Sequence, residues 1–261
     1  MQLSLKGKTA VVCGSTQGIG RAIAEELAQL GAQCILLARN EQALKEVVQH
    51  LEGLSPLGHT YAVADFSKVD EVKAAIEKIA ANQTVHILIN NTGGPAAGHL
   101  IDAVPDAFVA AFQQHLVNNH NLLQAVVPGM KKEGWGRVIN IISTSVKIPL
   151  NNLGVSNTIR GAVASWAKTA SNELAQFGIT VNNVLPGFTY TARLESLIKT
   201  NAQKGGRSEE EEAKKMAQEV PAKRFGSAAE VAAVAAFLAS PAASYVNGVS
   251  IPVDGGRTGS I

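Results

Sequence analysis

Three glycines near the N-terminus have the spacing of a phosphate-binding turn. They lie between a short apolar run and a helical pattern, in the residues Gly14, Ser15, Thr16, Gln17, Gly18, Ile19 and Gly20. Gly14 permits a tight turn, Gly18 lets the backbone approach a pyrophosphate, and Gly20 lets the helix pack close to the strand. The helix then presents unpaired N–H groups and its positive end to phosphates. A glycine cluster alone is weak evidence, but at the junction of the first strand and helix it predicts a dinucleotide site.

The end of the second predicted strand indicates which dinucleotide binds. In folds of this kind an acidic residue at that strand end holds the ribose hydroxyls of NAD. The strand Gln33–Ala38 ends without an acid, and Arg39 stands one position beyond the expected place. A guanidinium there can pair with a 2′-phosphate through several planar donors, although a surface arginine without a ligand is the alternative. We therefore expect NADP(H) in preference to NAD(H).

Strand-like and helix-like segments alternate along the chain and must position these residues. The expected strands are Thr9–Cys13, Gln33–Ala38, His59–Val63, Val85–Asn90, Arg137–Ile142, Thr180–Leu185 and Val249–Val253. The expected helices are Gly20–Leu30, Glu41–Leu51, Val69–Ala81, Pro105–Lys132, Ser156–Phe177 and Ala228–Ser240, and Gly31 and Gly178 follow two of them. Such alternation gives parallel strands joined by right-handed crossovers. The predicted fold class is α/β, a Rossmann-type doubly wound sheet of about seven parallel strands with helices on both faces, in one domain over 1–261.

Residues 188–226 depart from this alternation. The stretch is long, polar and low in strand character, and it follows a strand's carboxyl end. A long insertion of this kind in a compact domain is usually functional, so it is either a substrate lid or a mobile surface loop. The charge run Glu209–Glu212 within it is interpreted as the solvated start of a helix.

Composition excludes several classes of function. Hydrophobic residues make up 46% and charged residues 17% of the 261 residues, and the formal net charge is +2. No basic stripe with interleaved aromatics is present, so nucleic acid is not an expected partner. Cys13 and Cys34 have no metal or redox spacing and are interpreted as buried apolar residues, so no metal site is expected. The absence of a signal-peptide core and of any apolar run of about 18 residues predicts a cytoplasmic protein without a membrane span.

Several motifs in order resemble the short-chain dehydrogenases/reductases from about residue 5 to 256, with a pattern similar to 3-oxoacyl-acyl-carrier-protein reductases. They are the glycine motif, Asp65-Phe66, Asn90-Asn91-Thr92-Gly93, Gly136 to Ser143, Val181 to Gly187, and Arg224-Phe225-Gly226 through Val253-Asp254-Gly255-Gly256. The resemblance implies hydride transfer between a nicotinamide and a carbonyl or alcohol carbon. It also implies a cofactor-binding role for Asp65, Phe66, Asn91, Thr92, Gly93, Pro186, Gly187, Thr189 and Thr191.

The catalytic positions implied by the resemblance are mostly altered. Ser143 stands where the family has the serine that polarises the substrate oxygen. Ser156 takes the place of the tyrosine that transfers the proton, Arg160 that of the lysine, and His115 that of a helix asparagine supporting a proton relay. A tyrosine titrates near about 10 and is tuned by a cation, whereas an aliphatic hydroxyl is much less acidic. Arg160 keeps a charge that can bind the cofactor ribose, but it stays protonated and cannot relay protons.

Two other residues are candidates for the proton transfer. Tyr190 follows Pro186-Gly187 in the loop that covers the nicotinamide in the family, and it either reaches toward Ser143 or only contacts the substrate. An imidazole suits proton shuttling, so His115 is the second candidate, with a structural role on its helix as the alternative. His99 is a weaker candidate because it could equally be exposed to solvent.

These observations leave three hypotheses. The first is an NADP(H)-dependent reductase of a small carbonyl or alcohol substrate with an altered acid–base group. The second is a regulatory or binding protein that keeps the dinucleotide and has weak or no redox activity. The third is another reaction class, such as dehydration or epimerisation. The resemblance also implies a homo-oligomer, a tetramer or dimer, built through the helices Pro105–Lys132 and Ser156–Phe177 and the C-terminal segment. The sequence does not identify the substrate.

Overall fold

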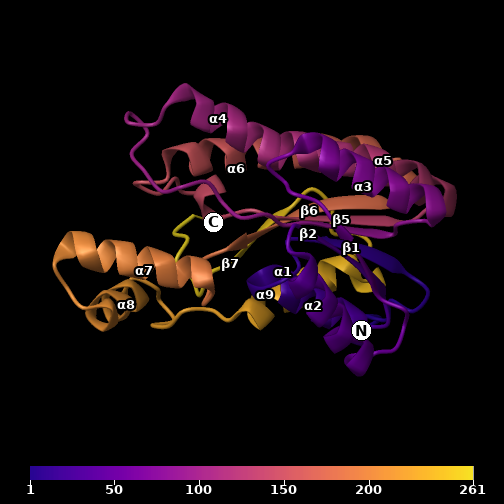
Figure 1. The fold of residues 1–261 in the computed structure, drawn as a ribbon, viewed down its shortest axis with the longest axis horizontal. Coiled ribbons are helices and arrows are strands. Elements are labelled where there is room, and N and C mark those ends of the chain that lie inside the picture. The colour runs from indigo at the N-terminus through magenta and orange to yellow at the C-terminus, as the bar shows by residue number, and fades with distance from the viewer. Residues whose placement is uncertain (261) are drawn as a thin grey trace.

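A parallel sheet runs through the part of the chain that this computed structural model describes, residues 1–260 (Figure 1). Its seven strands are β1 (Thr9–Cys13), β2 (Gln33–Ala38), β3 (Thr60–Val63), β4 (Ile87–Asn90), β5 (Gly136–Ile141), β6 (Ile179–Pro186) and β7 (Ser250–Val253). They lie in the order β3-β2-β1-β4-β5-β6-β7, and all neighbouring strands pair in parallel. From β1 the chain builds the sheet outward in one direction through β2 and β3, and then in the other direction from β4 to β7. The boundary between β1 and β4 is therefore the topological switch point, where ligands bind in open α/β sheets.

Helices cover both faces of the sheet, and the predicted fold class is confirmed (Figure 1). One face carries α1 (Gly18–Gln29), α2 (Glu41–Leu54) and α9 (Ala228–Ala239), and the other carries α3 (Val69–Asn82), α5 (Asn118–Glu133) and α6 (Gly154–Leu174). Strand side chains alternate between the two cores, because successive residues of a strand point to opposite faces. In β1, Ala10 and Val12 pack on the α1 side, while Val11 and Cys13 pack on the α5 side. Both cysteines are buried as predicted.

The helix predicted over Pro105–Lys132 is interrupted. The chain forms α4 (Pro105–Phe112), a π-helical turn over Gln113–Val117, and then α5. Such turns are rare and frequently lie at functional sites. Here the turn contains His115, whose imidazole pairs with Thr92 after β4. Periodicity could not predict the interruption, because one extra residue per turn leaves the apolar pattern on either side intact. Elsewhere the predicted bounds differ by up to three residues; α1, for instance, begins at Gly18 instead of Gly20.

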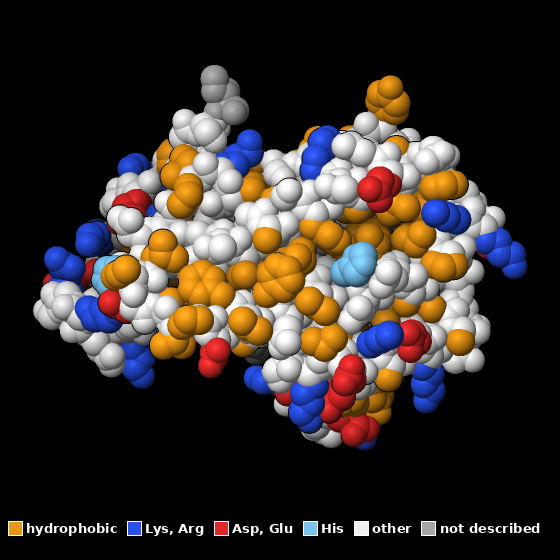
Figure 2. All heavy atoms as spheres, turned by 90° about the horizontal axis from the view of Figure 1, so that it is seen from above, with side chains coloured by type: hydrophobic (Ala, Val, Ile, Leu, Met, Phe, Trp, Pro, Cys, Tyr) orange, Lys and Arg blue, Asp and Glu red, His pale blue; other side chains and the backbone are white. Residues whose placement is uncertain are grey.

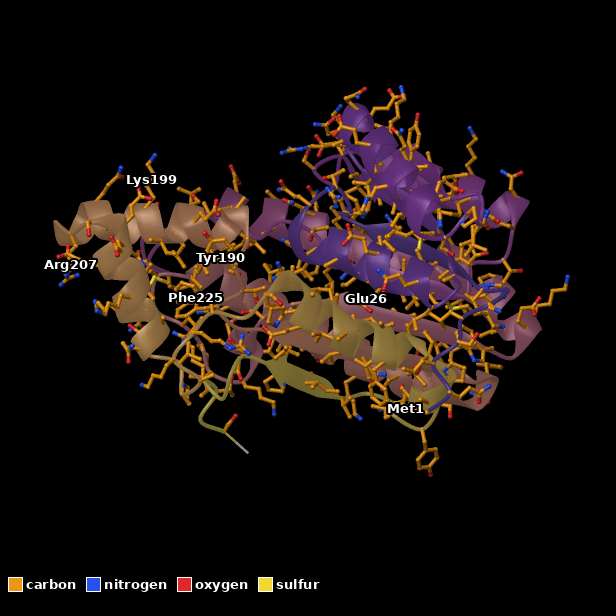
Figure 3. All side chains as sticks on the ribbon, turned by 90° about the horizontal axis from the view of Figure 1, so that it is seen from below. Met1, Glu26, Tyr190, Lys199, Arg207 and Phe225 are labelled. Carbon is orange, nitrogen blue, oxygen red and sulfur yellow. The ribbon has the colours of Figure 1, made fainter. Side chains whose placement is uncertain are left out.

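Residues 188–226, the two-helix segment, are more regular than predicted. They contain α7 (Ala192–Gly205) and α8 (Glu209–Gln218) with no strand between them, so the stretch does depart from the alternation of strands and helices, but most of it is helical. The two helices project from the carboxyl edge of the sheet, and Tyr190 and Phe225 lie near their base (Figure 3). Leu194, Ile198 and Met216 form a small apolar core between them. The segment is therefore a packed unit.

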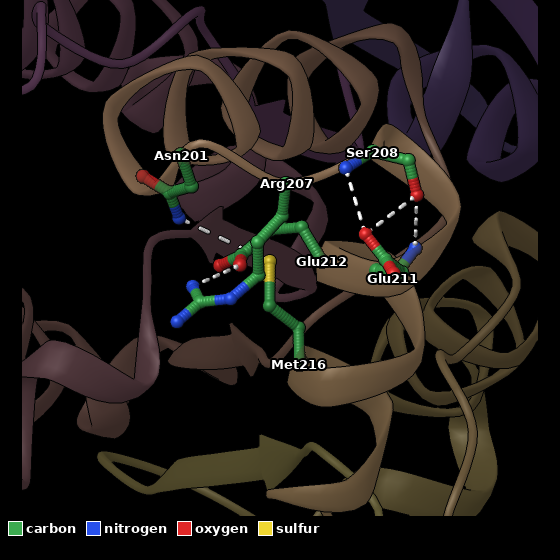
Figure 4. A network of polar contacts seen from close by, with 6 residues as sticks. All are labelled: Asn201, Arg207, Ser208, Glu211, Glu212 and Met216. Carbon is green, nitrogen blue, oxygen red and sulfur yellow. Dashed lines mark hydrogen bonds and ion pairs between the residues drawn. The ribbon is translucent and has the colours of Figure 1, made fainter.

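The polar residues of α8 explain how this segment stays ordered (Figure 4). Ser208 accepts a hydrogen bond from the Glu211 amide at 3.1 Å, and the Glu211 carboxylate accepts one from the Ser208 amide at 2.9 Å. This reciprocal capping box satisfies two amides that would otherwise lack partners. The charge run does begin a helix, as predicted, but Glu212 is buried and pairs with Arg207 at 3.3 Å.

Buried amides link four neighbouring strands across the sheet. The Asn90 amide donates to Asn140 Oδ1 at 2.8 Å, and the Asn140 amide donates to Asn183 Oδ1 at 2.9 Å. Asn183 in turn donates to Ser250 Oγ at 3.0 Å. Each bond satisfies a buried polar group whose desolvation would otherwise cost about 1–3 kcal/mol. These side-chain bonds follow the strand register and join β4, β5, β6 and β7. Within residues 1–260, no helix is long and apolar enough to cross a membrane.

Candidate active site

A cavity of about 720 Å³ follows the carboxyl ends of the strands. The residues predicted from the sequence that line it are Gly14, Thr16, Gln17, Gly18, Ile19, Arg39, Asp65, Phe66, Asn91, Thr92, Gly93, Ser143, Ser156, Arg160, Pro186, Gly187, Thr189, Tyr190 and Thr191. Three predicted residues, Ser15, Gly20 and His115, are not among the lining residues. The fold therefore brings nearly all the candidates together from seven separate segments.

The glycine motif forms a cradle between β1 and α1. Gly14 and Gly18 have φ of +58° and +55°, a conformation that side chains rarely adopt. A Cβ on Gly20 would overlap the Gly14 carbonyl oxygen, so the helix can pack this closely only on glycine. No side chain caps the first turn of α1, which leaves its N–H groups available to a ligand. Asn91 ties the cradle to the end of β4 by donating to the carbonyls of Cys13 and Gly14, each at 3.2 Å.

Arg39 and Asp65 lie at the opposite end of the cavity from Ser143, where strands β2 and β3 end. The Asp65 carboxylate accepts a hydrogen bond from the Ser67 amide at 2.9 Å. That bond holds the pKa of Asp65 below its usual value, with a smaller contribution from the charge of Arg39. Arg39 forms no ion pair with any residue between 1 and 260. Its guanidinium can therefore pair with an anionic ligand.

Ser143 and Ser156 both line the cavity. Ser143 follows β5 and begins a short 3₁₀ turn by accepting a hydrogen bond from the Ser145 amide at 3.1 Å. Because the bond uses an acceptor position of the oxygen, the hydroxyl hydrogen remains available as a donor. Ser156 lies in the first turn of α6 and lines the same cavity. The two hydroxyls can polarise a bound oxygen, but neither is acidic enough to replace a phenol.

Arg160 is a buried cation on α6 that lines the same cavity as these serines. Its Nη1 donates to the Ile141 carbonyl at 3.2 Å, and its Nη2 reaches the Thr92 carbonyl at 3.5 Å. Burial, with a smaller contribution from the charge of Arg193, lowers the pKa of Arg160 to about 10. The side chain stays charged at neutral pH and joins the ends of β4 and β5. It can hold hydroxyl groups or a developing negative charge, but it cannot release a proton in a neutral reaction.

His115 lies behind the cavity. Its Nδ1 is 2.7 Å from the hydroxyl oxygen of Thr92, and its buried Nε2 has no hydrogen-bond partner within residues 1–260. Burial lowers the pKa of His115 to about 3, and the nearby charge of Arg160 acts in the same direction. The imidazole is therefore neutral at pH 7. It reaches the cavity only through Thr92, which supports that side chain from behind.

Sequence reasoning missed two arginines that line the cavity. Arg193 lies in the first turn of α7 and donates to the Pro95 carbonyl at 2.8 Å. Arg257 follows β7 and stacks on the Phe188 ring at 4.0 Å. Neither stands in a motif, and only the folded chain brings them to the site. Tyr190 lines the cavity as well, but the residue is 61% exposed.

Comparisons with known proteins identify the family. A family model described as "Enoyl-(Acyl carrier protein) reductase" matches residues 14–258. The chain belongs to the short-chain dehydrogenases/reductases. It is 32% identical over 256 residues to the NADPH-dependent reductase BacG of Bacillus subtilis, covering 97% of this chain and 99% of BacG. It is 35% identical over 254 residues to the 3-oxoacyl-[acyl-carrier-protein] reductase FabG of Haemophilus influenzae, covering 97% and 98%.

A solved structure of L-sorbose reductase from Gluconobacter frateurii, complexed with NADPH and L-sorbose, superposes on this chain with a TM-score of 0.94. The two are 29% identical, and all of each chain is covered. The predicted family and its class of oxidoreductases are therefore confirmed. The preference for NADP(H) predicted from Arg39 agrees with the names of these relatives.

Proposed function

We propose that this protein is an NADP(H)-dependent oxidoreductase that reduces the carbonyl group of a small molecule, of 3-oxoacyl type or similar, by hydride transfer. The observation that carries the proposal is one continuous cavity with the glycine cradle and Arg39 at one end and Ser143 at the other. The cofactor supplies the hydride when it is bound. NADPH-dependent and 3-oxoacyl reductases among the relatives support the reaction class.

The residues present fit a phosphorylated dinucleotide. The cradle leaves backbone space that any Cβ would fill, and the uncapped start of α1 favours phosphate groups. Arg39 lies where a 2′-phosphate would follow the ribose, and Asp65 beside it can accept from an adenine amino group. Arg160 is placed to donate to the ribose hydroxyls next to the nicotinamide. Thr189 and Thr191 approach the cradle from the base of the two-helix segment, which we propose acts as a lid over residues 188–226.

Ser143 and Ser156 would orient the substrate oxygen. Their hydroxyls donate hydrogen bonds to it, and the fixed charge of Arg160 stabilises the negative charge that develops there. The proton of the product alcohol must come from elsewhere, because neither serine nor arginine is a suitable acid. Tyr190 is the phenol that lines the cavity, and solvent is the other source. The neutral imidazole of His115 acts only through Thr92.

The test combines cofactor binding with turnover. NADPH and NADH are titrated by fluorescence, and a panel of ketones is then followed at the nicotinamide absorbance. Ser143→Ala should lower kcat on the order of 100-fold, because it removes one donor to the developing oxyanion, and should leave the NADPH affinity unchanged. Ser145→Ala is the matched control, since its buried hydroxyl has no partner within residues 1–260 and does not line the cavity. Equal turnover in both variants would exclude Ser143 from the reaction.

One observation favours a second function. No phenol replaces the missing tyrosine at Ser156, and the one near the cavity, Tyr190, is largely exposed. A protein with this site could hold the dinucleotide for a regulatory or binding role with weak or no redox activity. Tight NADPH binding without turnover of any carbonyl in the panel would support that role, and failure to bind either nucleotide would exclude both.

We also propose that the protein forms a homo-oligomer, a dimer or tetramer. Apolar side chains gather on the face seen in Figure 2, over the helices that cover this side of the sheet. In α4, Val109 is 56% and Phe112 is 43% exposed, and Leu100 and Ile101 before that helix are also exposed. Exposed apolar patches of this kind favour association. Light scattering of the purified protein measures the number of copies.

A further inference from the structure

The charges around the cavity are unevenly distributed. At the end near Ser143, three arginines line it: Arg160, Arg193 and Arg257. The carboxylate among the described lining residues, Asp65, lies at the opposite end beside Arg39. Arg160 and Arg193 form no ion pair within residues 1–260, and the repulsion between such cations is weakly screened in a partly desolvated site. A bound anion would remove that cost.

Arg193 and Arg160 flank the same loop. The Nη2 of Arg193 donates to the Pro95 carbonyl at 2.8 Å, and a Cβ on Gly94 would lie 3.6 Å from the Nη2 of Arg160. The charge of Arg193 also contributes to the lowered pKa of Arg160. The bond to Pro95 uses one of the donors of Arg193, so the rest of its guanidinium can face a ligand.

Arg257 lies beyond Ser143 as seen from the cradle. It lines the main cavity and also an adjoining one of about 250 Å³. The other residues that line the adjoining cavity are Thr144, Ile148, Leu150, Thr258 and the acidic Glu219. The side chain is only 20% exposed and its guanidinium stacks on Phe188, which fixes its plane and leaves its in-plane donors available. Glu219 approaches it to 3.7 Å, which is a long ion pair and neutralises it incompletely.

We propose that Arg193 and Arg257 form an anion subsite that binds the carboxylate of a keto-acid substrate, while Ser143 binds its carbonyl oxygen. The inference rests on the proposed function and names the substrate class of that site. The phosphates of the cofactor have their own partners at the cradle and at Arg39, on the other side of Ser143. The adjoining cavity is small and partly apolar, which suits a short carbon chain ending in a carboxylate. A guanidinium fork matches that planar group.

The turnover test uses acid and ester pairs. Acetoacetate and levulinate are each compared with their methyl esters at saturating NADPH. The unmodified protein should have a KM at least about tenfold lower for the acids, because one charged hydrogen bond contributes about 1.5–3 kcal/mol. Arg257→Met should raise the KM for the acids about tenfold and leave the esters unchanged. The control, Lys199→Met, removes an equal charge from the exposed outer side of α7 and should change neither (Figure 3).

A binding test separates this inference from the proposed reaction. Calorimetry with the NADP⁺ complex compares succinate with neutral succinamide, and no turnover is needed. Tighter binding of succinate that is lost in Arg257→Met and weakened in Arg193→Met, but kept in Lys199→Met, supports the subsite even if no ketone is reduced. Equal binding of succinate and succinamide overturns it. Tighter binding of inorganic phosphate than of succinate also overturns it. A tenfold loss of NADPH affinity in both arginine variants would overturn it too, because Arg193 and Arg257 would then bind the cofactor.

Discussion

The two ends of the cavity are built from different parts of the chain. At the cradle, backbone conformation and the absence of side chains at Gly14, Gly18 and Gly20 create the binding surface. Near Ser143, the site depends on side chains, and two of them, Ser156 and Arg160, differ from the residues that the family pattern implies. Backbone geometry tolerates few replacements, whereas a side-chain role can be changed without altering the fold. This difference explains how one end keeps the family pattern while the other departs from it.

The largest effect is expected at the cradle. Gly14→Ala places a Cβ against the Asn91 carbonyl and amide in a backbone conformation with positive φ. We expect NADPH affinity to fall on the order of 100-fold, because the turn must open to relieve the overlap. Fluorescence titration measures it. Gly134→Ala is the control, since its φ is +62° but no atom lies within 4 Å of the added Cβ. It should cost some stability and no affinity, and equal NADPH affinity in the two variants would contradict the role of Gly14.

A smaller effect, on the pH dependence of stability, is expected from His115, which lies behind the cavity near Thr92. The pKa of His115 is about 3 in the folded protein and near 6.5 when unfolded. Between these values the unfolded chain binds one more proton, so stability falls as the pH drops from about 6.5 toward 3. At pH 5 His115 should cost about 2 kcal/mol of the free energy of unfolding relative to pH 7.

Urea denaturation of His115→Gln at the two pH values measures this cost. The variant should lose less stability on acidification than the unmodified protein, by about 2 kcal/mol. His99→Gln is the matched control because His99 is exposed, and it should behave like the unmodified protein. If His115→Gln loses as much stability between pH 7 and pH 5 as the unmodified protein, the imidazole is accessible to solvent. His115 would then again be a candidate for the proton relay.

The contrast between the two ends also decides what the sequence could predict. The alternation of strands and helices, both helical layers and the cradle follow from local patterns, because apolar periodicity and glycine spacing are local properties. The π-helical turn at His115 was not predictable, since it preserves the apolar pattern on both sides. In the two-helix segment the start of α8 was predicted but α7 was missed, because Leu194, Ile198 and Met216 become a core only when α7 packs on α8.

Arg193 and Arg257 show most clearly which residues near Ser143 sequence patterns do not reveal. They are 64 positions apart, and neither belongs to a recognisable motif. They line one cavity because β6 and β7 are neighbours in the sheet and both direct their following segments to the same edge. A charge that acts through tertiary placement leaves no periodic signal. The side chains that determine substrate choice are thus harder to predict than the backbone that binds the cofactor.

The smallest effect is expected on NADPH affinity when Arg39, which the sequence pattern identified at the cofactor end, is replaced. Arg39→Ala should weaken NADPH binding about tenfold, about 1.4 kcal/mol, because Arg39 is exposed and water screens part of its interaction with a 2′-phosphate. NADH affinity should not change, so the ratio of the two dissociation constants is the measured quantity. Arg39→Lys keeps the charge but loses the planar fork, and its ratio should fall between those of the other two proteins. If the ratio is the same in all three, Arg39 is a surface residue without a ligand, and the dinucleotide preference must come from other residues at the ends of β2 and β3.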